Sequence, residues 1–193
     1  MHVLSRCGHP ERLMAGLGQW ESKPIDLAMI RSADAGDSSE LASLYNHYVL
    51  ESTSTFEEYP VEPAVMAQRV AAVQDLNLPW RVAEQDGALA GYAYANRWNP
   101  RTAYRHTVEI SIYVSPECAQ KGLGSTLYTQ LFDDLQSLPV QQVMAMITLP
   151  NPLSIALHEK FGMSKVAHLS RVGFKFGKWL DVGYWQCSLA RPV

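Results

Sequence analysis

One segment of the chain, residues 106–136, changes its hydrophobic period abruptly at a glycine-rich loop. Before the loop, the stretch HTVEISIYV alternates apolar and polar residues, which predicts a β-strand with one buried face. After the loop, leucines recur every four residues from Leu123 to Leu135, which predicts an amphipathic α-helix. A strand that leads through a tight loop into a helix favours folds in which helices pack on a sheet, the α/β or α+β class.

The alternation in HTVEISIYV divides the side chains of this strand between two faces. The apolar set is expected to face the core and consists of Val108, Ile110, Ile112 and Val114. The other set is expected on the opposite face and consists of Thr107, Glu109, Ser111 and Tyr113. Glutamate is disfavoured within strands, so Glu109 is a candidate for a functional carboxylate.

Similar patterns divide the rest of the chain into strands and helices. The predicted strands lie at about 27–31, 80–95 (a hairpin around Asp86-Gly87), 143–149 and 165–189 (two strands around a loop). The other predicted helices lie at about 41–48, 63–73 and 151–161. The order β-α-α-β-β-β-α-β-α-β-β predicts a mixed sheet with helices packed on it.

Length and composition are those of one folded domain. The chain has 193 residues, of which 47% are hydrophobic and 18% charged. Residues 1–26 mix Gly, Pro and charges without a clear period, so we expect an N-terminal extension there and a single domain at 27–193.

Charge and cysteine usage exclude several classes of protein. The formal net charge is −3 without a long Lys/Arg run, which disfavours non-specific nucleic-acid binding. No apolar run reaches the roughly 20 residues that a membrane helix needs. Cys7, Cys118 and Cys187 are odd in number and far apart, so neither a disulfide framework nor a zinc ribbon is indicated. We expect a reduced, cytoplasmic protein.

The two glycines of the loop, Gly122 and Gly124, allow two interpretations. A helix that begins after a glycine loop can bind an anion, because its first amides lack partners and the helix dipole adds positive charge there. Glycine would let the backbone approach a phosphate closely, and Lys121 and Ser125 could add a charge and a hydroxyl. A simple turn explains the local spacing equally well.

Two other phosphate loops and one catalytic turn do not fit this stretch. No Gly-Lys-Ser/Thr follows, as a P-loop requires, and Leu127 stands where a Rossmann fingerprint needs its third glycine. The letters GLGST also do not form the G-x-S-x-G turn that carries a nucleophilic serine.

The wider pattern resembles a known family. The stretch VSPECAQKGLGSTLY is similar to the acetyl-CoA pyrophosphate loop of the GNAT N-acetyltransferase superfamily, whose signature is Q/R-x-x-G-x-G/A. With YNHYVLESTSTFE, GYAYANRW, LPNPLSIALHEKFG and GFKFGKWLDVGYWQ, it resembles the phosphinothricin/methionine sulfoximine acetyltransferase branch. The resemblance covers about residues 30–189 and implies the GNAT fold, a mixed, mostly antiparallel central sheet flanked by helices.

The chain departs from the family pattern at two places. The first signature position is Ala119, where the superfamily usually has Gln or Arg, so a side-chain contact to the pyrophosphate would be lost. Asn96 and Arg97 stand where relatives commonly have Gly-Pro before a tryptophan, which affects the details of the substrate site.

The activity that the resemblance implies sets the chemical demands. Moving an acetyl group from acetyl-CoA to an amine needs a base for the amine, stabilisation of the oxyanion and a proton for the thiolate, and no metal. The resemblance implies that Glu109 is the base, acting through water; by strand pattern alone it could simply face solvent. His158 matches the family's candidate proton donor, and Tyr128 is a second one. A surface or core role explains either residue as well.

The resemblance also assigns the ligand contacts. Acetyl-CoA, the co-substrate, would lie along the backbone of Tyr113 and Val114, with the Val114 amide facing the oxyanion. Its remaining contacts would come from Lys121, Gly122, Gly124, Ser125 and Asn151. The acceptor would be a small amino acid such as methionine sulfone, methionine sulfoximine or phosphinothricin, held by Phe56, Arg101 and Tyr104.

Three functions remain open from the sequence. The first is N-acetylation of these small amino acids, in a homodimer that uses the aromatic C-terminal segment, as in relatives. The second keeps the fold but uses another amine: an ordinary amino acid, a polyamine or a protein N-terminus. The third is an acyl-CoA-binding protein without catalysis, which Ala119 favours and which Glu109 and His158 disfavour.

Overall fold

The computed structural model describes residues 29–119 and 122–189. Its strands are β1 (Met29–Ser32), β2 (Trp80–Gln85), β3 (Ala88–Arg97), β4 (Thr107–Val114), β5 (Gln142–Leu149), β6 (Ser164–Lys175) and β7 (Lys178–Ser188). Its α-helices are α1 (Ser38–Glu51), α2 (Pro63–Asp75), α3 (Leu123–Gln136) and α4 (Pro152–Lys160). The order of these elements confirms the prediction. The expected extension at 1–26 lies outside the described residues.

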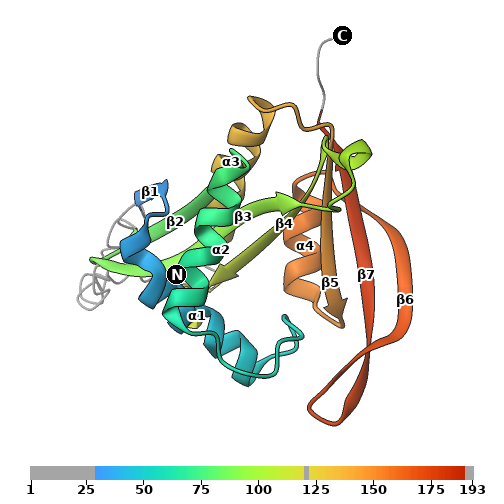
Figure 1. The fold of residues 1–193 in the computed structure, drawn as a ribbon. Coiled ribbons are helices and arrows are strands. Elements are labelled where there is room, and N and C mark those ends of the chain that lie inside the picture. Colours follow the sequence, from blue (N-terminus) through green and yellow to red (C-terminus); the bar gives the residue numbers. More distant parts are fainter. Residues whose placement is uncertain (1–28, 120–121, 190–193) are drawn as a thin grey trace, which may run out of the picture.

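The described strands form one seven-stranded sheet in the order β1-β2-β3-β4-β5-β7-β6 (Figure 1). Neighbouring strands run antiparallel except β4 and β5, which run parallel and are connected through α3. A parallel pair needs such a crossover connection, and the helical stripe after the glycine loop supplies it. The mixed, mostly antiparallel sheet with helices confirms the predicted fold class.

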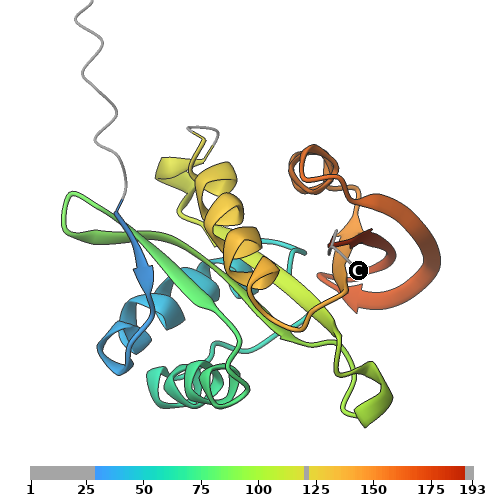
Figure 2. The same cartoon turned by 90° about the horizontal axis from the view of Figure 1, so that it is seen from above.

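Helices cover both faces of the sheet, α1 and α2 on one side and α3 on the other (Figure 2). The leucine stripe of α3 is buried as predicted, because Leu127, Leu131 and Leu135 have no exposed surface. Val108 and Ile110 of β4 belong to the same core, which confirms the predicted face of that strand. The opposite face of β4 therefore points toward α1 and α2.

Two tight turns set the registers of the hairpins. Asp86 and Gly87 join β2 to β3 with φ angles of 53° and 77°, and Phe176 and Gly177 join β6 to β7 with 50° and 71°. Two consecutive left-handed residues match the twist of antiparallel strands, which makes two-residue connections of this type favourable. The second turn places the tip of the β6–β7 hairpin far from the rest of the sheet (Figure 1).

The parallel pairing of β4 with β5 is short. Among the described residues it runs from Thr107↔Gln142 to Glu109↔Met144. Both strands continue for five more residues, each paired on its outer side, β4 with β3 and β5 with β7. The two strands therefore part toward their carboxyl ends and leave a gap between them (Figure 1).

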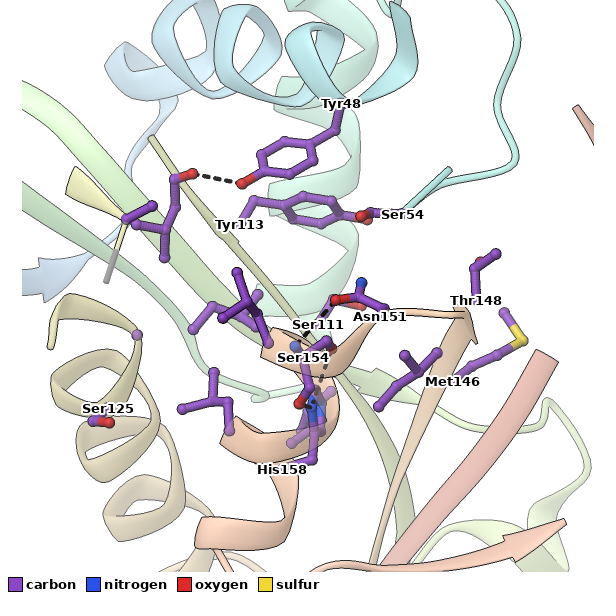
Figure 3. Close-up of a pocket in the computed structure, with 18 of the residues that line it drawn as sticks. Tyr48, Ser54, Ser111, Tyr113, Ser125, Met146, Thr148, Asn151, Ser154 and His158 are labelled. Atoms are coloured by element: carbon purple, nitrogen blue, oxygen red, sulfur yellow. Dashed lines mark hydrogen bonds between the residues drawn. The ribbon is translucent and has the colours of Figure 1, made fainter. Parts of the chain in front are cut away.

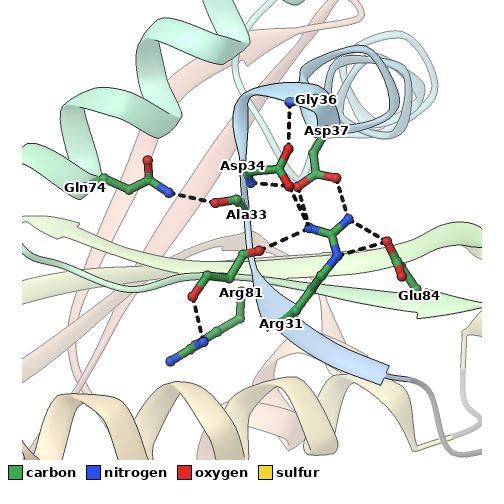
Figure 4. A network of polar contacts seen from close by, with 9 residues as sticks. Arg31, Ala33, Asp34, Gly36, Asp37, Gln74, Arg81 and Glu84 are labelled. Carbon is green, nitrogen blue, oxygen red and sulfur yellow. Dashed lines mark hydrogen bonds and ion pairs between the residues drawn. The ribbon is translucent and has the colours of Figure 1, made fainter.

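A polar network fastens the first strand at the other end of the sheet (Figure 4). The guanidinium of Arg31 donates hydrogen bonds to Asp37 at 2.8 and 2.6 Å and also pairs with Glu84. The Asp37 carboxylate accepts a further hydrogen bond from the Asp34 amide at 2.8 Å. These hydrogen bonds, chiefly the two from Arg31, lower the pKa of Asp37. The network joins three segments: β1, β2 and the turn that precedes α1. It lies away from the gap.

Candidate active site

A cavity of about 450 Å³ lies at the gap between β4 and β5 (Figure 3). Residues from α1, the loop after it, β4, β5 and both helices that follow these strands line the cavity. Tyr48 lies on one side, Met146 and Thr148 on another, and His158, in the last turn of α4, on the side away from Tyr48 (Figure 3). Two apolar residues of the lining are exposed: Met146 is 50% exposed and Leu153 is 62% exposed.

The register of β4 decides which of its backbone groups face the gap. The Ser115 amide donates to Ala90 and the Trp98 amide donates to the Thr107 carbonyl, so odd-numbered residues of this stretch pair with β3. Backbone direction alternates along a strand, so Ile112 and Val114 direct their amides and carbonyls toward β5. Since β5 has already parted from β4 in the described structure, these groups lie on an open strand edge beside the cavity.

Tyr48 fixes the end of this open edge. Its hydroxyl donates to the Val114 carbonyl at 2.6 Å, and its ring meets Tyr113 edge-on, with centroids 5.2 Å apart. The Val114 amide remains directed into the gap. Tyr113, by contrast, directs its backbone toward Tyr92 of β3 and lines the cavity through its ring. The sequence predicts that the backbone of both residues binds acetyl-CoA. In the structure, Val114 presents its backbone amide to the gap, whereas Tyr113 presents its side chain.

The glycine loop ends at the N-terminus of α3. Gly122 is the N-cap with φ 88°, a left-handed conformation that other residues adopt only with strain. Gly124 lines the cavity and also serves packing, because a Cβ there would lie 3.3 Å from a methyl carbon of Leu157 in α4. In the described part of this helix end, no acidic residue occupies the first turn and no side chain caps it. Its first amides therefore remain available for an anion.

Lys160 is a cation at this helix end that the sequence patterns did not reveal. Its ammonium donates to the Ser125 hydroxyl at 2.8 Å, from the last residue of α4. A positive charge is unfavourable beside the positive end of α3, unless an anion lies there. It also lies at the C-terminus of its own helix, where a cation is favourable. Lys121, the predicted cation, lies outside the described residues.

Asn151 has the position and the capping role that the sequence predicts. Its side-chain oxygen accepts from the Ser154 amide at 3.1 Å and caps α4, whose first residue is Pro152. The residue also lines the cavity, so the capping role leaves it within reach of a ligand.

Glu109 lies where β4 and β5 separate. It is the last residue of β4 paired with β5 and stands opposite Asn96 of β3. Its side chain is on the strand face of Ser111 and Tyr113, and it is half-buried. Burial raises its pKa, because removal from water disfavours the carboxylate. A carboxylate with a raised pKa is better matched to accepting a proton near neutral pH.

His158 and Tyr128 form a buried pair. The Tyr128 hydroxyl lies 2.8 Å from Nε2 of His158, and Nδ1 lies 2.7 Å from the Ser154 carbonyl. A carbonyl only accepts, so Nδ1 bears the hydrogen and Nε2 accepts from Tyr128. Burial lowers the pKa of His158 and raises that of Tyr128, so both are neutral at pH 7. His158 lines the cavity, whereas Tyr128 has no exposed surface.

The predicted acceptor residues are not brought together. Phe56 packs against Gly173 of the β6–β7 hairpin. Arg101 and Tyr104 are exposed, in the loop that precedes β4, and Tyr104 meets the Trp98 ring edge-on. None of the three lines the cavity of the described chain, and Arg101 and Tyr104 lie at the opposite end of β4 from it.

Several cavity residues were assigned no role by the sequence patterns, although three of them lie in stretches that resemble the family. They are Tyr48, Ser54, Met146, Thr148 and Ser154. The one available signal was position: Met146 and Thr148 share the strand before the Asn151 cap, and Ser154 lies one turn before His158.

Two other kinds of site were sought among the described residues. No group of three or more His, Cys, Asp or Glu could hold a metal ion, and none of the described helices has the length and hydrophobicity of a membrane span.

Comparison with known proteins agrees with this geometry. A family model described as an acetyltransferase (GNAT) domain matches residues 30–183. The chain therefore belongs to the GNAT acetyltransferase family, and the resemblance in the sequence is confirmed.

Individual relatives are similar over most of their length. A phosphinothricin N-acetyltransferase from Streptomyces viridochromogenes is 40% identical over 173 residues, 90% of this chain and 92% of the relative. An L-methionine sulfoximine/L-methionine sulfone acetyltransferase from Salmonella typhimurium is 35% identical over 160 residues, 83% of this chain and 94% of the relative. A GNAT phosphinothricin acetyltransferase from Sinorhizobium meliloti, solved in complex with acetyl-CoA, has a TM-score of 0.82 at 38% identity, with 86% and 94% coverage.

The buried pair predicts the titration of His158. Nitrogen NMR of the folded protein should show the neutral tautomer with hydrogen on Nδ1 and a pKa below the ordinary 6.5. His158 has the higher pKa in the unfolded chain, so the unfolded chain takes up a proton first as the pH falls. The free energy of unfolding should therefore decrease as the pH falls below about 6.5. Tyr128→Phe removes a donor to the neutral ring and should raise the pKa of His158. Hydrogen on Nε2 at pH 7 would contradict the assigned geometry.

Proposed function

We propose that this protein transfers the acetyl group of acetyl-CoA to the α-amino group of a small amino acid. The proposed acceptors are methionine sulfoximine, methionine sulfone and phosphinothricin. The observation that supports this most is the gap between β4 and β5. Beside it lie an open strand edge, the half-buried carboxylate of Glu109 and the N-terminus of α3, which no side chain caps within the described residues. The names of the similar proteins support the choice of acceptors.

The groups around the gap fit acetyl-CoA. We assign the pantetheine arm to the open edge at Ile112 and Val114, where an elongated amide-containing chain can pair with backbone groups. We assign the pyrophosphate to the N-terminus of α3, with Gly122, Gly124 and Ser125, and with Lys160 in place of the side chain missing at Ala119. Lys121 and Asn151 complete the proposed contacts. When bound, acetyl-CoA supplies an activated acetyl group.

We assign Glu109 as the general base that removes a proton from the acceptor amine, through a water molecule. Its raised pKa keeps it a stronger base than an exposed carboxylate. The Val114 amide, directed into the gap, would donate to the oxygen on which negative charge develops. No covalent link to the protein is needed for this transfer.

We assign His158 as the proton source for the leaving sulfur and Tyr128 as the residue that orients its ring: the Nδ1 hydrogen goes to the sulfur, and Nε2 takes up the Tyr128 hydroxyl proton, so the ring stays neutral. His158 lines the cavity, and the Ser154 hydroxyl, also at the cavity, lies 3.4 Å from its Nδ1. Tyr128 is too buried to touch a ligand in the described structure, so orientation of His158 is the role that its position supports.

We further propose a homodimer in the cytoplasm. The β6–β7 hairpin exposes five large apolar side chains, each about half accessible: Val166, Val172, Phe174, Phe176 and Trp179. Exposed apolar patches of this kind mark interaction surfaces. A second copy on this surface could also bring Arg101 and Tyr104 of one subunit near an acceptor, which the single chain does not. Light scattering at micromolar concentration tests the dimer, and a monomer would contradict it.

The acceptor is tested by following CoA release with a thiol reagent. Purified protein and acetyl-CoA are mixed with methionine sulfone, methionine sulfoximine, phosphinothricin, methionine or a polyamine. We expect turnover confined to the first three. Preference for methionine or the polyamine would keep the chemistry and change the acceptor. Silence with all five, despite acetyl-CoA binding, would favour a binding protein without catalysis.

Glu109→Gln tests the base. We expect turnover to fall by about 10²–10⁴-fold, the usual contribution of a positioned base, with the dissociation constant for acetyl-CoA nearly unchanged. The loss should be larger at pH 7 than at pH 9, because more acceptor is already free amine at the higher pH. Turnover equal to that of the unmodified protein across this range would remove Glu109 from the mechanism.

A further inference from the structure

We propose that Lys175 is a positioning residue that holds the loop 52–58, between α1 and α2, in the shape that forms the acceptor side of the cavity. The idea rests on the proposed function, because it concerns the same acceptor. Lys175 lies near the tip of the β6–β7 hairpin, within the stretch GFKFGKWLDVGYWQ, and the residue has been assigned no role in the reaction.

The ammonium of Lys175 is buried and donates two hydrogen bonds to backbone carbonyls. The residue is 1% exposed, and its Nζ donates to the Ser52 carbonyl at 2.9 Å and to the Thr55 carbonyl at 2.8 Å. The Phe176 ring lies 4.9 Å away and offers its face to the cation. Both carbonyls belong to one loop, more than a hundred residues away in sequence.

The loop held in this way borders the cavity. Ser54, between the two carbonyls, lines the cavity, and Phe56, the predicted acceptor contact, comes directly after Thr55. On its other side the loop is tied to α1. The Tyr45 hydroxyl lies 2.7 Å from the Thr55 hydroxyl and donates to Glu57 at 3.0 Å. The loop is thus fastened between α1 and the hairpin.

Gly173 of the same hairpin forms a second contact with the loop. A Cβ at this position would lie 2.2 Å from a ring carbon of Phe56, so no other residue fits without moving that ring. The hairpin thus contacts the loop in two ways. Lys175 binds its backbone, and Gly173 leaves the space that the Phe56 ring occupies.

Packing alone does not explain a lysine at this position. Taking an ammonium out of water is costly, and an apolar side chain of similar size would fill the same space without that cost. What the ammonium adds is direction, since it requires two particular carbonyls at hydrogen-bond distance. Because both hydrogen bonds come from one ammonium, they hold the two carbonyls, and hence the loop between them, in one conformation.

The experiment compares Lys175→Met with Arg81→Met. Arg81 is a matched control because its guanidinium pairs with Asp134 at 2.6 Å, between β2 and α3, away from the cavity. With methionine sulfone as acceptor, we expect Lys175→Met to raise the KM for the acceptor at least tenfold. The KM for acetyl-CoA should stay within twofold, and Arg81→Met should change neither. Gly173→Ala approaches the same loop without removing a charge and should also raise the acceptor KM.

Amide exchange of residues 54–58, without substrates, tests the loop itself. We expect faster exchange in Lys175→Met than in the unmodified protein and in Arg81→Met. An unchanged acceptor KM, or unchanged exchange of the loop, would overturn the positioning role. If the unmodified protein acetylates none of the proposed acceptors, the proposed function fails by itself, and the exchange measurement still decides whether Lys175 holds the loop.

Discussion

The parallel pairing between β4 and β5 stops at Glu109 and Met144, and the proposed site depends on that stop. Both strands keep their outer partners, so the sheet remains continuous around the gap. Beyond this stop, the backbone N–H and C=O groups along the facing edges of β4 and β5 have no strand partner. Unsatisfied groups of this kind cost about 1–3 kcal/mol each when buried, and an elongated ligand with amide groups can satisfy them.

The remaining parts of the site are placed around this gap by separate segments. The crossover from β4 to β5 contains the glycine loop, so the N-terminus of α3 comes to the mouth of the gap. The residues that follow β5 form the cap of α4, which brings His158 and Lys160 to the same place. The C-terminal hairpin reaches back to the loop after α1. Donor and acceptor sides are therefore supported by different elements, and either could be altered with little effect on the other.

Local patterns were sufficient to predict the parts of the site that depend on local conformation. The change of period around the glycine loop predicted β4 and α3, the φ of 88° explains Gly122, and a proline-flanked asparagine predicted the Asn151 cap. Gly124 is the instructive exception. Its spacing in the sequence suggests only close approach of a ligand, and the structure shows that its small size also makes room for Leu157 of a different helix.

The parts that were missed depend on contacts between distant segments. Lys175 meets loop carbonyls more than a hundred residues away, and Lys160 meets Ser125 from another helix, so no spacing in the sequence reveals either contact. The direction of the Val114 amide was implied by the family resemblance, and the register between β3 and β4 gives its physical reason. Arg101 and Tyr104 match the family pattern, yet the position of their loop in the single chain does not bring them to the cavity.

The open strand edge is tested most directly by residue-resolved amide exchange with and without acetyl-CoA. If acetyl-CoA binds along this edge, the Val114 and Ile112 amides should exchange more slowly in its presence, as should the first amides of α3. The Tyr113 amide, directed toward β3, should change little and serves as an internal control. Binding without added protection at Val114 and Ile112 would contradict the proposal that this edge holds the co-substrate.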